Sequence, residues 1–147
     1  QTRDIPPRRT PCIATMARPR NFDEATVTSH AAAVFGRLGY NAASIDDLVK
    51  ATGLLRGSLY KAFGSKQHLF ERVLEQALQP GWPARQEAVD LLIIALKELA
   101  PADAAITALC RAAVLETGAA TARLLGERLL HPLDPAPKET PPCLSSN

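Results

Sequence analysis

Apolar residues recur at intervals of three and four along most of the chain, the spacing of one face of an α-helix. The alternation of apolar and polar residues that marks a half-buried strand is absent from the sequence. The first apolar stripe predicts a helix from about Asp23 to Leu38, which Gly39 would end. We therefore expect an all-α fold. The inward face of this first helix is predicted to hold Val27, Ala31, Val34, Phe35 and Leu38.

Two short helices separated by a tight glycine turn follow in the pattern. Ser44 is a good N-cap for the first of them, which should end at Gly53. The second is predicted from about Leu55 to Ala62, with Gly64 as its stop. Their inward residues are expected to be Ile45, Leu48, Val49, Leu59 and Phe63.

Three longer helical stretches complete the chain. Ser65 should cap a helix that runs to about Leu78, and another is predicted over 84–99 with Trp82 as an anchor over the core. From Asp103 the helical spacing continues to about Leu130, where Gly118 kinks or divides the segment. The expected inward residues are Leu69, Phe70, Val73, Leu74, Ala77, Val89, Leu92, Ile93, Leu96, Ile106, Leu109, Cys110, Ala113, Val114, Thr117, Leu124 and Leu125.

Composition narrows the class of protein. The longest wholly apolar run, 91–96, is far shorter than the roughly 20 residues that span a bilayer, so we expect a soluble, cytoplasmic protein without a membrane partner. The cysteines and histidines are dispersed, which argues against a disulfide framework or a metal site. No Ser/His/Asp or Cys/His constellation, paired acid or glycine-rich phosphate loop is apparent. We expect neither an enzyme nor a cofactor.

The ends and the middle of the chain differ in composition. Nine of the twelve prolines lie in 1–19 and 132–147, which predicts extended tails. Because the only methionine is Met16, residues 1–15 are expected to be a disordered or non-native extension. Charge is also divided: residues 1–70 hold ten Lys and Arg against five Asp and Glu, and the remainder holds seven against ten. A basic front half favours a polyanionic partner.

The stretch 44–66 carries the candidate chemistry. Two short helices around a tight turn have the geometry of a helix-turn-helix, whose second helix enters the major groove of DNA. Polar donors gather on that second helix, and Gly57 would allow its start to approach DNA closely. These donors are Arg56, Ser58, Tyr60 and Lys61.

The same stretch resembles a known family. Leu59, Tyr60, Phe63 and Lys66, followed by Leu69, form a Leu-Tyr-x-x-Phe-x-x-Lys pattern. With this pattern, residues 16 to about 78 resemble the DNA-binding domain of the tetracycline-repressor (TetR) family of bacterial transcription regulators. Further residues stand where that family has such residues, namely Phe35, Gly39, Tyr40, Ser44, Ile45, Leu48, Ala51 and Gly53.

The resemblance implies roles for individual residues. Ser44, Tyr60 and Lys66 would contact phosphate, and Arg18 and Arg20 would form a short basic arm that reaches the backbone or minor groove of DNA. Bases or the adjacent backbone would be faced by Arg56, Gly57, Ser58 and Lys61. The sequence departs from the family pattern at Leu55, which replaces a small polar cap, and at Thr28 and His30, which replace apolar residues.

The resemblance also implies an organisation and a function. We expect a DNA-binding domain over 16–79, a shortened helical regulatory or dimerisation region over 80–131 and a proline-rich tail over 132–147. The whole would be a homodimeric, ligand-responsive repressor that binds a near-palindromic operator in double-stranded DNA. The alternative is a truncated paralogue that acts as a protein-interaction or heterodimerising module.

Overall fold

The structure, a computed structural model, describes residues 23–131. Over this range the chain forms helices and no strand, which confirms the expected all-α class. The proposed basic arm at Arg18 and Arg20 and both proline-rich ends lie outside the described residues. The elements are α1 (Glu24–Leu38), α2 (Ile45–Thr52), α3 (Arg56–Phe63), α4 (Lys66–Ala77), the 3₁₀-helix η1 (Trp82–Ala84), α5 (Gln86–Ile94), the π-helix η2 (Ala95–Leu99), α6 (Ala104–Thr117) and α7 (Ala120–Leu130).

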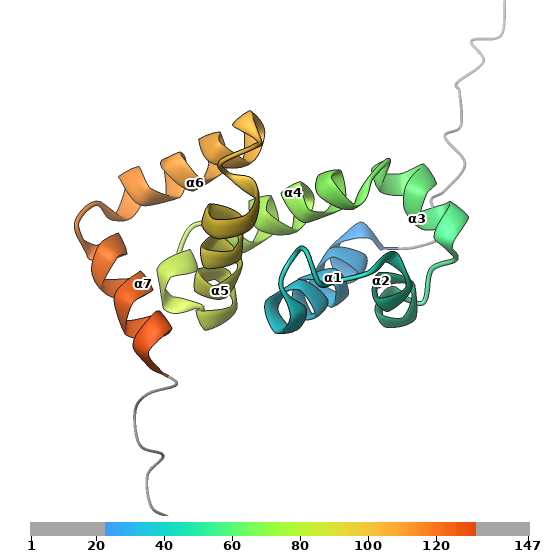
Figure 1. The fold of residues 1–147 in the computed structure, drawn as a ribbon, viewed down its shortest axis with the longest axis horizontal. Coiled ribbons are helices and arrows are strands. Elements are labelled where there is room, and N and C mark those ends of the chain that lie inside the picture. Colours follow the sequence, from blue (N-terminus) through green and yellow to red (C-terminus); the bar gives the residue numbers. More distant parts are fainter. Residues whose placement is uncertain (1–22, 132–147) are drawn as a thin grey trace, which may run out of the picture.

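Helix α4 joins the two halves of the molecule. It packs with α1 and α3 of the front half and with α5 and α6 of the back half (Figure 1). Helix α1 lies against α2, α4 and α5, so the three-helix front half and the back half share one hydrophobic core. Phe35, Tyr40 and Phe70 form an aromatic cluster in this core, with the Phe35 and Phe70 ring centroids 5.0 Å apart in an edge-to-face arrangement.

Short polar residues begin most of the helices as their sequence positions predict. The side chains of Asp23, Ser44, Ser65 and Asp103 each accept hydrogen bonds from backbone N–H groups of the turn that follows. These bonds satisfy donors that a helix start otherwise leaves unpaired. Helices α3, α5 and α7 are exceptions: their N-caps are Leu55, Arg85 and Ala119, and no side chain caps them.

The helix predicted over 84–99 is present from Gln86, but it starts later than expected and its last turn is not α-helical. The chain instead forms η1, then α5, and then the π-helix η2, which closes with a bond of 2.8 Å from the Ala100 N–H to the Ala95 carbonyl. The buried face is only partly the one expected: Val89 and Leu92 are buried as predicted, whereas Ile93 and Leu96 are only half-buried. The buried residues of α5 and η2 are Ala88, Val89, Leu91, Leu92, Ala95 and Leu99.

Several expectations for single residues have clear outcomes. Trp82 and Cys110 are buried as predicted, and Gly118, at φ +56°, divides the last helical segment into α6 and α7. Leu38, expected to face inward, is 37% exposed because it lies in the last turn of α1. Most inward positions predicted for α6 and α7 are only half-buried, namely Leu109, Val114, Thr117, Leu124 and Leu125.

Candidate nucleic-acid interface

Helices α2 and α3 form the helix-turn-helix unit. Gly53, at φ +70° in the left-handed region, ends α2, and α3 starts after a turn of only a few residues. Leu59 and Phe63 are buried and fix α3 to the core. The remaining face of α3 is turned outward: Ser58 is half-buried, and the exposed residues are Arg56, Gly57, Tyr60 and Lys61.

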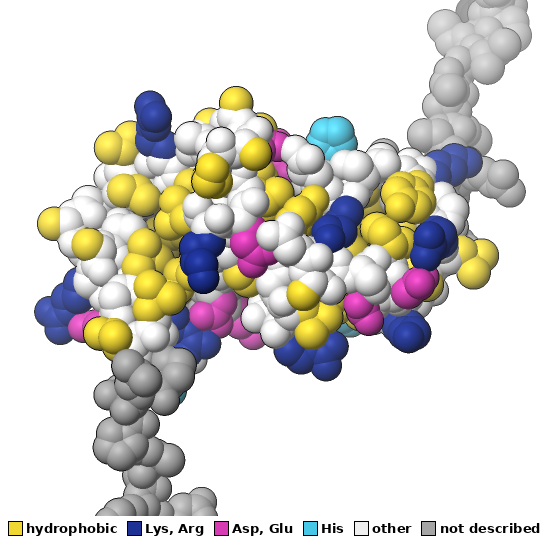
Figure 2. All heavy atoms as spheres, viewed as in Figure 1, with side chains coloured by type: hydrophobic (Ala, Val, Ile, Leu, Met, Phe, Trp, Pro, Cys, Tyr) yellow, Lys and Arg dark blue, Asp and Glu magenta, His cyan; other side chains and the backbone are white. Residues whose placement is uncertain are grey.

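Basic side chains surround the α2–α3 end of the molecule. Figure 2 shows Lys and Arg side chains spread over this end, with acidic side chains among them. The surface is therefore of mixed charge rather than a uniform basic patch. Phosphate contacts would depend on particular side chains more than on a large positive field.

Arg56, the residue placed to contact bases, has an intramolecular partner. Its Nη2 lies 2.5 Å from Oδ1 of Asp46, and both side chains are more than half exposed. The hydrogen bond to Asp46 raises the pKa of Arg56. An exposed ion pair of this kind contributes little to stability, so it can be given up for a stronger contact. The pair fixes the first residue of α3 against α2.

Lys66, predicted to contact phosphate, is turned toward the turn between α1 and α2. Its Nζ donates to the Ala43 carbonyl at 2.7 Å and lies 4.4 Å from the centroid of the Tyr40 ring. Burial lowers the pKa of Lys66, and the negative charge of Glu98 acts in the opposite direction. An ammonium group has three N–H donors, so this arrangement leaves donors for a phosphate. The bond to Ala43 is an intramolecular role that the sequence did not reveal.

Ser44 takes part in a reciprocal cap at the start of α2. Its Oγ accepts from the Asp47 N–H at 3.1 Å, and its own N–H donates to Asp47 Oδ2 at 3.0 Å. The hydroxyl also donates to that carboxylate at 2.6 Å. These bonds lower the pKa of Asp47. A phosphate contact through the Ser44 hydroxyl proton would have to compete with this bond.

The unusual residues of α1 are accommodated without an unpaired polar group. Thr28 is buried, but its Oγ1 hydrogen-bonds the Glu24 and Ala25 carbonyls, at 2.9 and 3.0 Å, and the Gln76 side chain of α4. His30 is exposed. The hydroxyl therefore joins α1 to α4 where the family pattern has an apolar contact.

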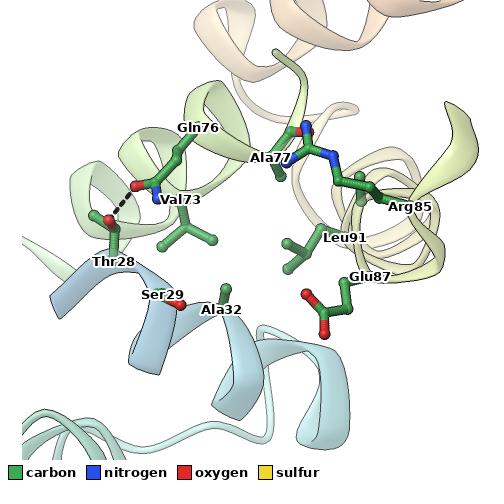
Figure 3. A pocket seen from close by; sticks show the side chains of 10 residues that line it. Thr28, Ser29, Ala32, Val73, Gln76, Ala77, Arg85, Glu87 and Leu91 are labelled. Atoms are coloured by element: carbon green, nitrogen blue, oxygen red, sulfur yellow. Dashed lines mark hydrogen bonds between the residues drawn. The ribbon is translucent and has the colours of Figure 1, made fainter. Parts of the chain in front are cut away.

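A shallow hollow of about 120 Å³ lies beside this bond, between α1, α4 and α5 (Figure 3). It lies at the junction of the two halves. Arg85 borders it, but its Nη2 donates to the Ala77 carbonyl at 2.7 Å and caps the end of α4. The lining residues are Thr28, Ser29, Ala32, Val73, Gln76, Ala77, Arg85, Glu87, Ala88 and Leu91.

Sequence analysis missed two contacts between the front and back halves. The Glu98 carboxylate accepts the Asn41 backbone N–H, and the Asp103 carboxylate accepts a hydrogen bond from the Gln67 side chain. Both contacts join residues that are far apart in the chain, so no local pattern marks them.

Within 23–131, no helix is both long enough and apolar enough to cross a membrane. Over the same residues, no three His, Cys, Asp or Glu side chains are grouped so that they could hold a metal ion.

Comparison with known proteins agrees with this geometry. A family model described as bacterial regulatory proteins, tetR family, matches residues 27–73, which contain most of α1, all of α2 and α3 and the first part of α4. The chain is similar to the uncharacterized HTH-type transcriptional regulator YezE of Bacillus subtilis, with 39% identity over 64 residues. That match covers 44% of this chain and 33% of the relative.

Two repressors of Escherichia coli are also similar to it. The HTH-type transcriptional repressor ComR is 36% identical over 80 residues, which are 54% of this chain and 38% of the relative. The HTH-type transcriptional repressor BdcR is 41% identical over 59 residues, which are 40% of this chain and 30% of the relative. The chain thus spans about a third of the length of the curated relatives it matches. The helix-turn-helix segment of the chain, residues 27–73, is thus similar to the tetR family of bacterial regulatory proteins.

Proposed function

We propose that this protein is a transcription regulator that binds double-stranded DNA with α3, its recognition helix, in the major groove. The observation that carries this proposal is the division of α3 into two faces. Leu59 and Phe63 are buried, whereas Tyr60, 43% exposed, and Lys61 project outward. A helix held in this way can present polar side chains to DNA without losing its packing.

The residues proposed to bind DNA divide by the kind of contact. Tyr60, Lys66 and Ser44 would bind phosphate, which fixes the register of the protein on the duplex. Arg56 would read guanine through a bidentate contact, once it has exchanged its partner Asp46 for a base. Lys61, Gly57 and Ser58 would face bases or the adjacent backbone, and the arm at Arg18 and Arg20 would add contacts to the backbone or minor groove.

The arrangement in space follows from two copies of the chain. We infer a homodimer in which two recognition helices read half-sites about 34 to 36 Å apart in a near-palindromic operator. Support comes from the apolar surface over α6 and α7 (Figure 2), where Leu115 is 75% exposed and Leu129 and Leu130 are also exposed. The region 16–79 would bind DNA, and the region 80–131 would dimerise and respond to a small-molecule effector as part of a repressor.

Selection of bound duplexes from a random library, followed by affinity measurements over a range of salt concentrations, tests the proposal. Tyr60→Ala and Lys61→Ala should each weaken binding, and Lys61→Ala should reduce the slope of log affinity against log salt by about 1. Lys97→Ala is the matched control, because Lys97 is an exposed lysine of the back half. A folded protein that selects no sequence, or whose affinity is unchanged by both variants, would refute the proposal.

A second function is favoured by two observations. Arg56 is already paired with Asp46, and the apolar face of α6 and α7 has no partner among the described residues. A protein-interaction or heterodimerising module would have both features. Stable association with another protein, together with DNA affinity that does not respond to Tyr60→Ala, would support this alternative.

A further inference from the structure

A carboxylate from the back half contacts the turn that precedes α2. Glu98 lies in η2, and its Oε2 accepts the backbone N–H of Asn41 at 2.6 Å across 57 residues of sequence. Its other oxygen lies over Gly39, where a Cβ would come within 2.9 Å of it. A Cβ at Gly39 would therefore require the end of the Glu98 side chain to shift. The carboxylate therefore lies directly against the backbone of the turn.

The same turn holds two of the proposed phosphate contacts in place. It leads into Ser44, the N-cap of α2, and its Ala43 carbonyl accepts the hydrogen bond from Lys66. The negative charge of Glu98 also acts on Lys66. Displacement of this turn would move both the start of α2 and the Ala43 carbonyl that accepts the hydrogen bond from Lys66.

The direction of Glu98 depends on the π-helix. A π-turn holds one residue more than the α-helical turn it replaces, and each residue of an α-helix advances by about 100°. If η2 were wound as α-helix, Glu98 would be rotated about the helix axis from the direction in which it meets Asn41. Isolated π-turns inside helices are often found at functional sites, which fits a turn that aims one side chain.

A second contact holds the end of this segment. Asp103 accepts the Ile106 N–H at 3.0 Å and thereby caps α6, and its carboxylate also accepts a hydrogen bond from Gln67 of α4. The segment from η2 to the start of α6 is thus attached to the front half at both ends.

We propose that Glu98 is a positioning residue for DNA binding: it holds the turn between α1 and α2 so that Ser44 and Lys66 meet the phosphate backbone. This inference rests on the proposed function.

The direction of the change in DNA affinity when Glu98 is replaced distinguishes a positioning role from a purely electrostatic one. Removal of a negative charge near the DNA-binding face should strengthen DNA binding if charge alone matters. Loss of a positioning contact should weaken it.

The first test measures the affinity of the full chain for a duplex that it has selected from a random library. Glu98→Ala should weaken binding about tenfold, equivalent to about 1.4 kcal/mol. Glu98→Gln keeps an acceptor oxygen for the Asn41 N–H and should restore most of the affinity. Glu116→Ala, which removes a charge from an exposed site on α6, is the matched control and should leave affinity near that of the wild type. Unchanged or stronger binding by Glu98→Ala would overturn the proposal.

Hydrogen exchange of the Asn41 amide, measured by NMR without DNA, is the second test. Glu98→Ala should speed exchange at Asn41 and leave the amides of α7 unchanged, and unchanged exchange at Asn41 would overturn the proposal. If the wild type binds no DNA, the proposed function fails, whereas exchange at Asn41 still decides whether Glu98 holds the turn. If Glu98→Ala does not fold, Glu98→Asp withdraws the carboxylate by one methylene and takes its place, with the same expected result.

Discussion

The recognition helix starts without a side-chain cap, and supplying one should stabilise the protein. Leu55, the N-cap of α3, is 77% exposed, so its replacement forfeits little buried surface. Its φ of −68° and ψ of 147° already match the extended conformation of an N-cap. A serine here would place its hydroxyl oxygen within reach of the N–H groups of Gly57 and Ser58. Leu55→Ser should therefore add a hydrogen bond without moving the backbone.

The expected gain is the ordinary value of an N-cap, about 1 kcal/mol with a range of roughly 0.5 to 2. For a folded region of this size, that value corresponds to a rise in Tm of about 4 °C. Serine is preferred to aspartate because a carboxylate at the start of α3 would add negative charge to the proposed DNA-binding face.

Thermal and urea unfolding, followed by circular dichroism, measure the change. Leu55→Ala is the control, since it removes the same exposed side chain and supplies no cap. The difference in unfolding free energy between Leu55→Ser and Leu55→Ala isolates the hydrogen bond. Equal stabilities of these two variants would refute the reasoning that the first turn of α3 lacks an acceptor.

Three further perturbations test other parts of the structure. Burial raises the pKa of the Cys110 thiol to about 11 from 9.0. The folded state therefore favours the neutral thiol, and the resulting contribution to the free energy of unfolding is fully present below pH 9 and is lost as the pH rises from 9 to 11. At pH 8, alkylation of Cys110 in native protein, followed by peptide mass spectrometry, should be about 100-fold slower than in urea. Gly39→Ala should cost about 1 kcal/mol more than Gly53→Ala in urea unfolding, because Gly39, at φ 82° and ψ 169°, lies in a region that essentially only glycine adopts, whereas Gly53, at φ 70° and ψ 5°, lies in the left-handed helical region; equal costs would contradict this. Arg128→Ala should lower the free energy of unfolding by about 1 kcal/mol, because it removes the bidentate ion pair with Asp90 that joins α7 to α5. Arg128→Lys should retain only part of this stability. Thermal unfolding at low and high salt checks this, and full restoration by lysine would argue against the paired geometry.

The helices of the front half could be predicted because their signals are local. A polar cap at Ser44 or Ser65 and a glycine stop at Gly53 act within one turn of the residue that carries them. The apolar stripe of α1 identifies most of its buried face for the same reason. Local chemistry of this kind can be read directly from the order of residues.

The π-helix could not be predicted in this way. The apolar residues of 84–99 are so dense that several helical faces fit them equally well, and hydrophobic spacing alone does not choose among them. Packing against α1 and α4 buries Leu91 and Ala95 instead of Ile93 and Leu96. The contact of Glu98 with Asn41 follows from that choice, so it was beyond reach of the sequence pattern as well.

The partners of Lys66 decide which variants can test DNA binding. Its ammonium group donates a hydrogen bond to the Ala43 carbonyl and lies over the Tyr40 ring. Lys66→Ala would therefore disturb the turn before α2 as well as any phosphate contact. A loss of affinity in that variant would not show which role had been removed. Tyr60 and Lys61 lie on the exposed face of α3, where truncation leaves the core intact. Variants of these two residues therefore measure contact with DNA, whereas a variant of Lys66 measures contact and positioning together.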